Sequence, residues 1–169
     1  MQDTELFLSL AEIAGVFVGF GALIAVRSGG ASEAREVTYI RSVVWLGLWV
    51  VVAALAPVVI SGYDVAGHGM WVACSLLVLA LFWVIWLTNR RTPEHRMDMA
   101  TYPRAVVVEY TLLLAVLVVP QNAALVLVVL GLFPDLEPAL YLTAVALGLI
   151  LGGTALLGLV FSRGRPQTA

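Results

Sequence analysis

The sequence contains no lysine, and all nine of its basic residues are arginine. Retinal Schiff bases and pyridoxal phosphate both need a lysine amine, so these two kinds of cofactor chemistry are excluded. Cys74 is the single cysteine, which leaves no partner for an intrachain disulfide and no thiolate cluster for a metal. His68 and His95 both fall in predicted loops, so a bis-histidine haem site within the predicted spans is excluded. We therefore expect no cofactor and no metal.

Charge is also scarce, because 12% of the residues are charged whereas 62% are hydrophobic, and the mean hydropathy is +1.01. Soluble domains have about 45–50% apolar residues, so most of this chain is expected to contact lipid or another span. The start, Met-Gln-Asp-Thr-Glu, lacks the basic region of a secretory signal peptide. We predict a multi-pass protein of the plasma membrane, of the bacterial inner-membrane type, with no nucleic-acid partner.

Five apolar stretches follow one another, and each has about the 17–25 residues that a spanning helix requires. They are residues 6–26, 42–60, 70–88, 105–130 and 139–161. The predicted fold class is an all-α polytopic membrane protein with five transmembrane helices in one membrane domain, residues 1–169. We expect the first helix to pack centrally against two helical hairpins.

The arginines predict the orientation, because cytoplasmic segments carry an excess of basic residues. They lie in or beside the two long polar segments and in the C-terminal tail, whereas the opposite side carries acidic residues and no arginine. This pattern predicts an N-terminus outside and a C-terminus in the cytoplasm. Tryptophans near the predicted span ends are expected to anchor at the membrane interface. They are Trp45, Trp49, Trp71, Trp83 and Trp86.

A short motif recurs 63 residues apart, where Thr38-Tyr39-Ile40-Arg41 overlies Thr101-Tyr102-Pro103-Arg104. The same register places Pro57 on Pro120. Spans two–three and four–five are therefore predicted to be parallel copies of one hairpin, as in several transporter folds. Two interpretations of the motif stay open. In one, the threonine caps the helix and the arginine reaches towards water. In the other, Arg41, Arg104, Tyr39 and Tyr102 bind anionic lipid or a cytoplasmic partner.

Glu12 interrupts the first apolar stretch, and an intramembrane carboxylate is expected to face protein or water. On a helix it shares a face with Gly15 and Gly19, which permit close helix packing. A second small-residue strip that includes Ala14 lies on the opposite side, so we expect neighbours on both sides. Two roles for Glu12 stay open. It is a cation or proton site, including a ring of carboxylates around an oligomer axis, or it fixes helix packing by hydrogen bonding.

Polar residues also occur in the predicted fourth span, where Gln121 and Asn122 follow Pro120 near its middle. They offer hydrogen-bonding groups to backbone, water, an ion or a substrate, and a helix–helix hydrogen bond is the alternative. Glu109 lies near the cytoplasmic end, and three roles stay open: it pairs with an arginine of another helix, lines an inner vestibule, or reaches the interface.

Other polar and small residues are predicted to be structural. In the fifth span, Gly148 and Gly152 form a close-packing seam. Four side chains are expected to bond back to their own helix carbonyls. They are Cys74, Ser75, Thr143 and Thr154.

Enzyme activity is not expected, because the spans contain no base beside a candidate nucleophile other than the two glutamates. The predicted function is a small homo-oligomeric channel or transporter for cations or protons. Its pathway residues would be Glu12, Gln121, Asn122 and Glu109. The alternative is a structural or accessory membrane subunit that binds a partner protein or anionic lipid through its arginine-rich loops.

Overall fold

The computed structural model describes residues 2–27, 34–63, 65–91 and 104–162. These residues form five long α-helices and one short 3-10 helix, and they contain no strand. The elements are α1 (Gln2–Arg27), α2 (Ala34–Ser61), α3 (His68–Arg90), α5 (Arg104–Val129), η1 (Pro134–Leu136) and α6 (Glu137–Ser162). The all-α prediction is confirmed, and each of the five predicted apolar stretches corresponds to one helix.

The helices extend beyond the apolar stretches, most clearly in α2, which begins at Ala34. Thr38 therefore lies inside the helix, and its predicted capping role is wrong. Pro57 and Pro120 lie within α2 and α5, and both helices continue past them. His68, predicted in a loop, is the first residue of α3.

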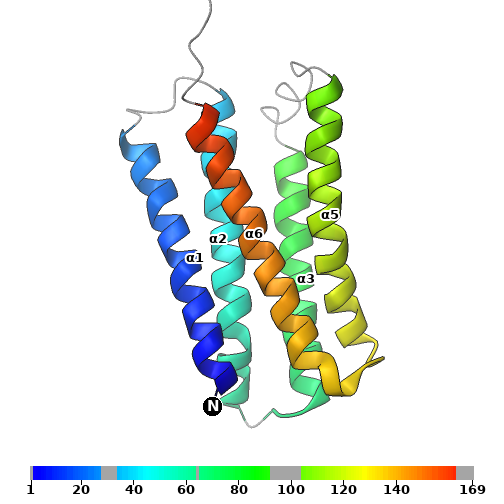
Figure 1. The fold of residues 1–169 in the computed structure, drawn as a ribbon. Coiled ribbons are helices and arrows are strands. Elements are labelled where there is room, and N and C mark those ends of the chain that lie inside the picture. Colours follow the sequence, from blue (N-terminus) through cyan, green and yellow to red (C-terminus); the bar gives the residue numbers. More distant parts are fainter. Residues whose placement is uncertain (1, 28–33, 64, 92–103, 163–169) are drawn as a thin grey trace, which may run out of the picture.

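The helices run side by side, and α2, α3, α5 and α6 form a closed four-helix bundle (Figure 1). Each of these four packs against the next along the chain, and α6 packs back against α2. The α2–α3 turn, η1 and the starts of α3 and α6 lie at one end of the bundle, which we call the His68 end. The starts of α2 and α5 lie at the opposite end, called the Arg41 end.

Helix α1 lies at the edge of the bundle and packs mainly on α2, with a smaller contact to α6 (Figure 1). The prediction that the first helix packs centrally is therefore wrong. Gly47 of α2 explains the close α1–α2 approach, because a Cβ atom there would lie 2.4 Å from Val18 Cγ2 and 3.4 Å from the Ala14 carbonyl oxygen. Ala14 is fully buried in this contact. Ala14, a member of the second small-residue strip, thus packs against α2.

Trp49 lies at the centre of the bundle and is 1% exposed. Its Nε1–H donates to the carbonyl oxygen of Val78 at 3.0 Å, and its ring meets that of Phe82 edge to face. Gly148 makes room for the indole, since a Cβ atom at that position would lie 2.2 Å from Trp49 Cζ3. The predicted interfacial location of Trp49 is therefore wrong. A carbonyl acceptor and a glycine inside the bundle allow the indole to be buried there.

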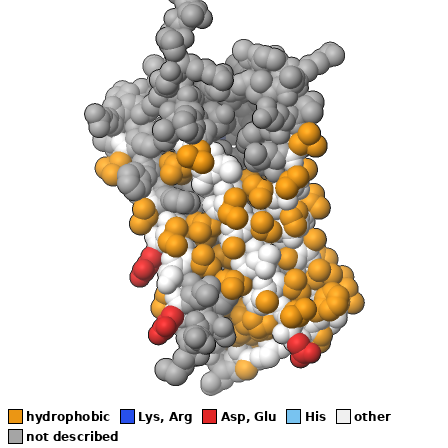
Figure 2. All heavy atoms as spheres, viewed as in Figure 1, with side chains coloured by type: hydrophobic (Ala, Val, Ile, Leu, Met, Phe, Trp, Pro, Cys, Tyr) orange, Lys and Arg blue, Asp and Glu red, His pale blue; other side chains and the backbone are white. Residues whose placement is uncertain are grey.

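The outer surface of the bundle is apolar, with hydrophobic side chains spread over the visible face (Figure 2). Exposed examples on three different helices are Leu76, Val116 and Ile150. Three helical segments among the described residues are long and apolar enough to cross a membrane, namely Arg41–Ser61, His68–Thr88 and Pro134–Leu157. Soluble monomers rarely expose continuous apolar surface of this kind. The structure therefore fits a membrane protein.

Candidate functional site

Glu12 lies on the outward side of α1 and is exposed within the protomer. It is ten residues from the start of the helix, or about 15 Å along its axis. Its neighbours along the same side are apolar and also exposed, with Leu8 at 42% and Val16 at 53%. Figure 2 shows acidic side chains standing on the outer edge of α1. Between Leu8 and Gly19, Glu12 is the one charged residue, and its side chain is exposed on the surface of the described chain.

Gly15 and Gly19 lie on the same outward side as Glu12. A Cβ atom built at either glycine would have no neighbouring atom within 4 Å. Gly47, in the contact between α1 and α2, has atoms well inside that distance. We name the residues Leu8, Glu12, Gly15 and Gly19 the open face of α1. In the described chain this face has the small residues of a helix–helix contact but no helix against it.

Gln121 lies inside the bundle and is 1% exposed, with its Oε1 atom lacking a hydrogen-bond partner. Asn122 is half-buried, and its Nδ2–H donates to the Val118 carbonyl oxygen of its own helix at 2.8 Å. Its Oδ1 atom is buried without a partner. The two amides therefore leave two acceptor oxygens in the interior for which the described protein supplies no donor.

Ser75 of α3 is fully buried, and its hydroxyl oxygen also lacks a hydrogen-bond partner. The prediction that Ser75 bonds back to its own helix is therefore wrong. Thr143 and Thr154 do behave as predicted, because their hydroxyls donate to the carbonyl oxygens of Ala139 and Leu151. Ser75 is a polar residue of the interior whose importance the sequence did not indicate.

Four of the remaining predicted residues lie towards the Arg41 end, namely Tyr39, Arg41, Arg104 and Glu109. Arg41 is half-buried, and Tyr39, Arg104 and Glu109 lie in α2 and α5, with side chains outside the described residues. Tyr102 lies outside the described residues altogether. Both predicted packing glycines of α6 lie against α2. Gly148 faces the Trp49 ring, and a Cβ atom added at Gly152 would lie 3.7 Å from the Cβ atom of Leu46.

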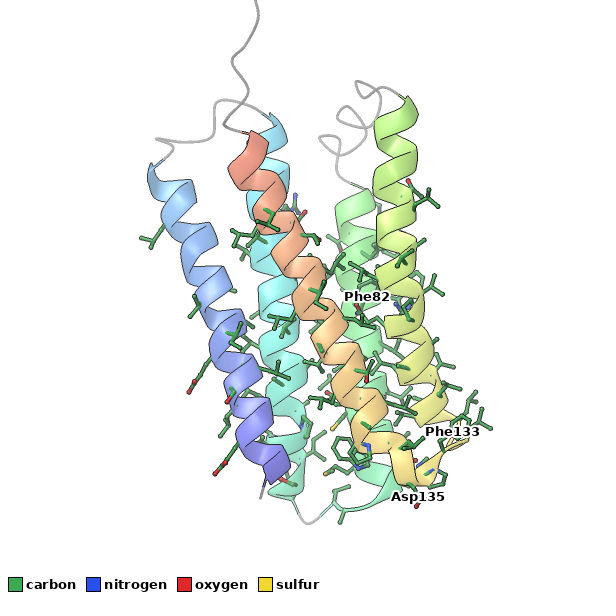
Figure 3. All side chains as sticks on the ribbon, viewed as in Figure 1. Phe82, Phe133 and Asp135 are labelled. Carbon is green, nitrogen blue, oxygen red and sulfur yellow. The ribbon has the colours of Figure 1, made fainter. Side chains whose placement is uncertain are left out.

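A histidine–glutamate pair at the His68 end was not predicted. His68 Nδ1 hydrogen-bonds with Glu137 Oε1 at 2.5 Å, joining the first residues of α3 and α6. The Glu137 side chain is 3% exposed, whereas that of His68 is 53% exposed. Asp135 and Phe133 lie beside this pair along the chain, at the turn between α5 and α6 (Figure 3). The sequence places the two partners 69 residues apart, and no local spacing links them.

The predicted pathway residues do not gather at one place within the protomer. Glu12 faces outward from α1, whereas Gln121 lies in the interior of a bundle whose α5 is on the far side from α1 (Figure 1). No group of three or more metal-ligating side chains occurs among the described residues. Comparisons with protein-family models, curated proteins and solved structures gave no match to this chain.

Proposed function

We propose that the protein is a small homo-oligomeric channel or transporter for cations or protons, with Glu12 in a pathway between protomers. The single observation that carries this proposal is the exposed carboxylate of Glu12 on an apolar helix face. Translocon-insertion scales put an acidic residue at the centre of a spanning helix at about 2.5–3.5 kcal/mol. A carboxylate at this position therefore favours contact with water or protein over contact with lipid.

A second copy of the chain is the occupant that we propose for the open face of α1. Gly15 and Gly19 allow the backbone of another helix to approach closely, because no atom of the protomer fills the space beside them. Packing α1 against α1 of a neighbour would bring two or more Glu12 carboxylates near a common axis. Rings of carboxylates select cations in channels. This assembly would therefore shield Glu12 from lipid and give it a function in cation selection.

The membrane topology belongs to the same proposal. We propose that α1 and α5 cross the bilayer along with α2, α3 and α6, so that five helices span with the His68 end outside. The helix bounds support this orientation, since Arg27 ends α1, Arg90 ends α3 and Arg104 starts α5, all at the Arg41 end. Glu5, Asp135 and Glu137 lie towards the opposite end. Basic residues on the cytoplasmic side agree with the usual charge asymmetry of membrane proteins.

The closed order of α2, α3, α5 and α6 supports the proposed hairpin repeat. A twofold axis along the bundle would exchange α2 with α5 and α3 with α6, and each helix would keep the same two kinds of neighbour. Parallel repeats of this kind occur in transporters. The repeat would then account for the bundle, and α1 would be the added element that carries the acidic residue.

The experiment that tests the proposal is a flux measurement on purified protein in liposomes. Sodium, potassium and proton gradients are imposed in turn, and protein-free vesicles give the background. We expect flux of at least one cation above background and its loss when the open face is blocked, for example by Gly19→Leu. Absence of flux for every ion, with the protein correctly inserted, would overturn the transport function.

The second candidate is an accessory membrane subunit that uses its basic end. The grouping of arginine-bearing helix ends at one end of the bundle favours it, because such clusters bind anionic lipid headgroups or acidic partners. This candidate predicts no flux, together with binding to vesicles containing anionic lipid that falls in an Arg41→Ala, Arg104→Ala double variant. Retained binding in that variant would exclude these two arginines as the binding site.

A further inference from the structure

Two helices of the bundle contain a proline in their interior, Pro57 in α2 and Pro120 in α5, and each helix continues past it. A proline has no backbone N–H, so the carbonyl oxygen four residues earlier loses its helical hydrogen bond. The carbonyl groups concerned belong to Ala53 in α2 and Val116 in α5. In apolar surroundings a backbone carbonyl group needs another donor. The structure treats the two carbonyl groups differently.

In α2 a side chain of another helix replaces the missing donor. The hydroxyl of Tyr141, in α6, donates to the Ala53 carbonyl oxygen at 2.7 Å. Both residues are 0% exposed, and Pro57 is buried as well. The Trp71 ring lies beside the Tyr141 ring, with 5.6 Å between their centroids. This hydrogen bond, which we call the Tyr141 latch, therefore supplies the bond that Pro57 removes from α2 and connects α2 to α6.

The latch connects the two helices on which α1 packs. Helix α1 makes its main contact with α2 and a smaller one with α6. Gly47, at the close approach of α1 to α2, precedes Ala53 by less than two helical turns. The Tyr141 latch therefore holds together the helices that position α1 and its Glu12 side chain.

The break in α5 lies in a different setting. The 63-residue spacing that places Pro57 on Pro120 also relates Tyr141 to Val78 of α3. Valine has no hydroxyl, so this second position cannot form the counterpart of the Tyr141 latch. Pro120 is exposed and Val116 is 68% exposed, so the broken side of α5 faces out of the described bundle. A bend at Pro120 therefore meets no packed helix of the described chain on this side.

The residues that follow Pro120 give a second reason for α5 to move. Gln121 is 1% exposed, and its Oε1 atom has no hydrogen-bond partner among the described residues. The Oδ1 atom of Asn122 is also buried without such a partner. Buried polar atoms without partners raise the free energy of the arrangement that contains them. Because these atoms directly follow the missing helical hydrogen bond, the middle of α5 is held less firmly than the middle of α2.

We propose that Pro120 is the hinge of a conformational change in α5, and that the Tyr141 latch prevents Pro57 from acting as a second hinge in α2. The hinge deepens the proposed transport function and rests on it for its physiological role, because transporters move one part of the protein against another. The bending itself does not require transport, so the two ideas can be tested apart.

The test is backbone amide hydrogen exchange of the purified protein in detergent, followed in residues 54–61 of α2 and 117–124 of α5. We expect faster exchange in the α5 segment, because segments that open locally lose their protection. Tyr141→Phe removes the latch hydroxyl and should raise the exchange rate of the α2 segment about tenfold. Tyr63→Phe is the matched control, because Tyr63 is 77% exposed, and it should leave both segments unchanged.

Two further variants separate hydrogen bonding from packing. Pro57→Ala supplies an N–H for the Ala53 carbonyl oxygen, so in this background Tyr141→Phe should no longer raise the exchange rate of α2. Pro120→Ala supplies an N–H for the Val116 carbonyl oxygen and should slow the exchange of the α5 segment to that of the α2 segment.

Several results would overturn the proposal. Equal exchange of the two wild-type segments, or an α5 rate that Pro120→Ala does not lower, would reject the hinge. An effect of Tyr141→Phe that is the same with and without Pro57 would reject the latch. If Tyr141→Phe fails to fold, Pro120→Ala decides the matter for the hinge. Faster exchange in α5 without ion flux would leave the hinge standing and reject transport, whereas flux with equal exchange would reject the hinge alone.

Discussion

The ring of His68 and the carboxylate of Glu137 connect the first residues of α3 and α6, with Nδ1 2.5 Å from Oε1. The Glu137 side chain is almost completely buried, whereas that of His68 is 53% exposed, so the hydrogen bond joins a buried carboxyl group to a ring that reaches solvent. The ring also packs against Gly131, whose φ of +63° allows the chain to turn from α5 towards η1. Three segments of the chain therefore meet at this pair.

Removing the histidine from this pair should destabilise the bundle. His68→Ala leaves the Glu137 carboxylate buried without its partner, and we expect the free energy of unfolding to fall by about 1–3 kcal/mol. Glu137→Gln should cost less, because the amide oxygen still accepts from the ring. Unfolding of His68→Ala, Glu137→Ala and their double variant in detergent gives the coupling energy, because each of these changes removes the hydrogen bond. If the two single effects simply add, the pair contributes no interaction energy and this account of the His68 end is wrong.

The contact between Trp49 and Gly148 predicts a difference between two glycines on α6. Gly148→Ala would place a methyl group 2.2 Å from the indole, and the buried ring has no free direction in which to move. Overpacking of this kind typically costs 1–3 kcal/mol. Gly152→Ala is the matched control, because its methyl group would lie 3.7 Å from Leu46. Thermal unfolding of both variants measures the difference, and equal midpoints would contradict the placement of Trp49.

Replacing a glycine should have different effects on the two sides of α1, the side that packs on α2 and the open face. Gly47→Ala introduces a clash with Val18, so it should lower the Tm of the protomer by separating α1 from α2. Gly15→Leu adds a side chain to open space, so it should leave the protomer fold intact and weaken self-association. Tm and molecular mass in detergent are measured for each variant. A loss of fold in Gly15→Leu would show that the open face of α1 is not open.

The positions of the helices along the chain were predictable from the sequence, but which helices pack against each other was not. Hydropathy averaged along a stretch indicates that a helix is apolar, and all five helices were located in this way. It does not say which side meets protein. Helix α1 carries small residues on two sides, and among the described residues Ala14 is buried whereas Gly15 and Gly19 are exposed. The location of Trp49 was mispredicted for a related reason. An indole is stable at a membrane interface and also in a protein interior where a carbonyl oxygen accepts its N–H, and the sequence does not distinguish these two locations.

Some of the candidate residues could be recognised from the sequence, and others could not. Glu12 and Gln121 were found because polar groups are conspicuous within apolar stretches. Ser75 was missed because the sequence cannot tell whether a hydroxyl reaches the carbonyl one turn back. The His68–Glu137 pair was missed because its members begin two separate helices, and their meeting depends on how those helices pack.

The central claim is that Glu12 lies in a cation pathway along α1, and the most direct measurement is flux through liposomes containing Glu12→Gln. Glu5→Gln is the matched control, because Glu5 is exposed on the same side of the helix two turns nearer its start. We predict that Glu12→Gln abolishes the flux of the wild-type protein without changing its oligomeric mass, and that Glu5→Gln retains most of it. Wild-type flux in Glu12→Gln would contradict the claim and remove the carboxylate from the pathway.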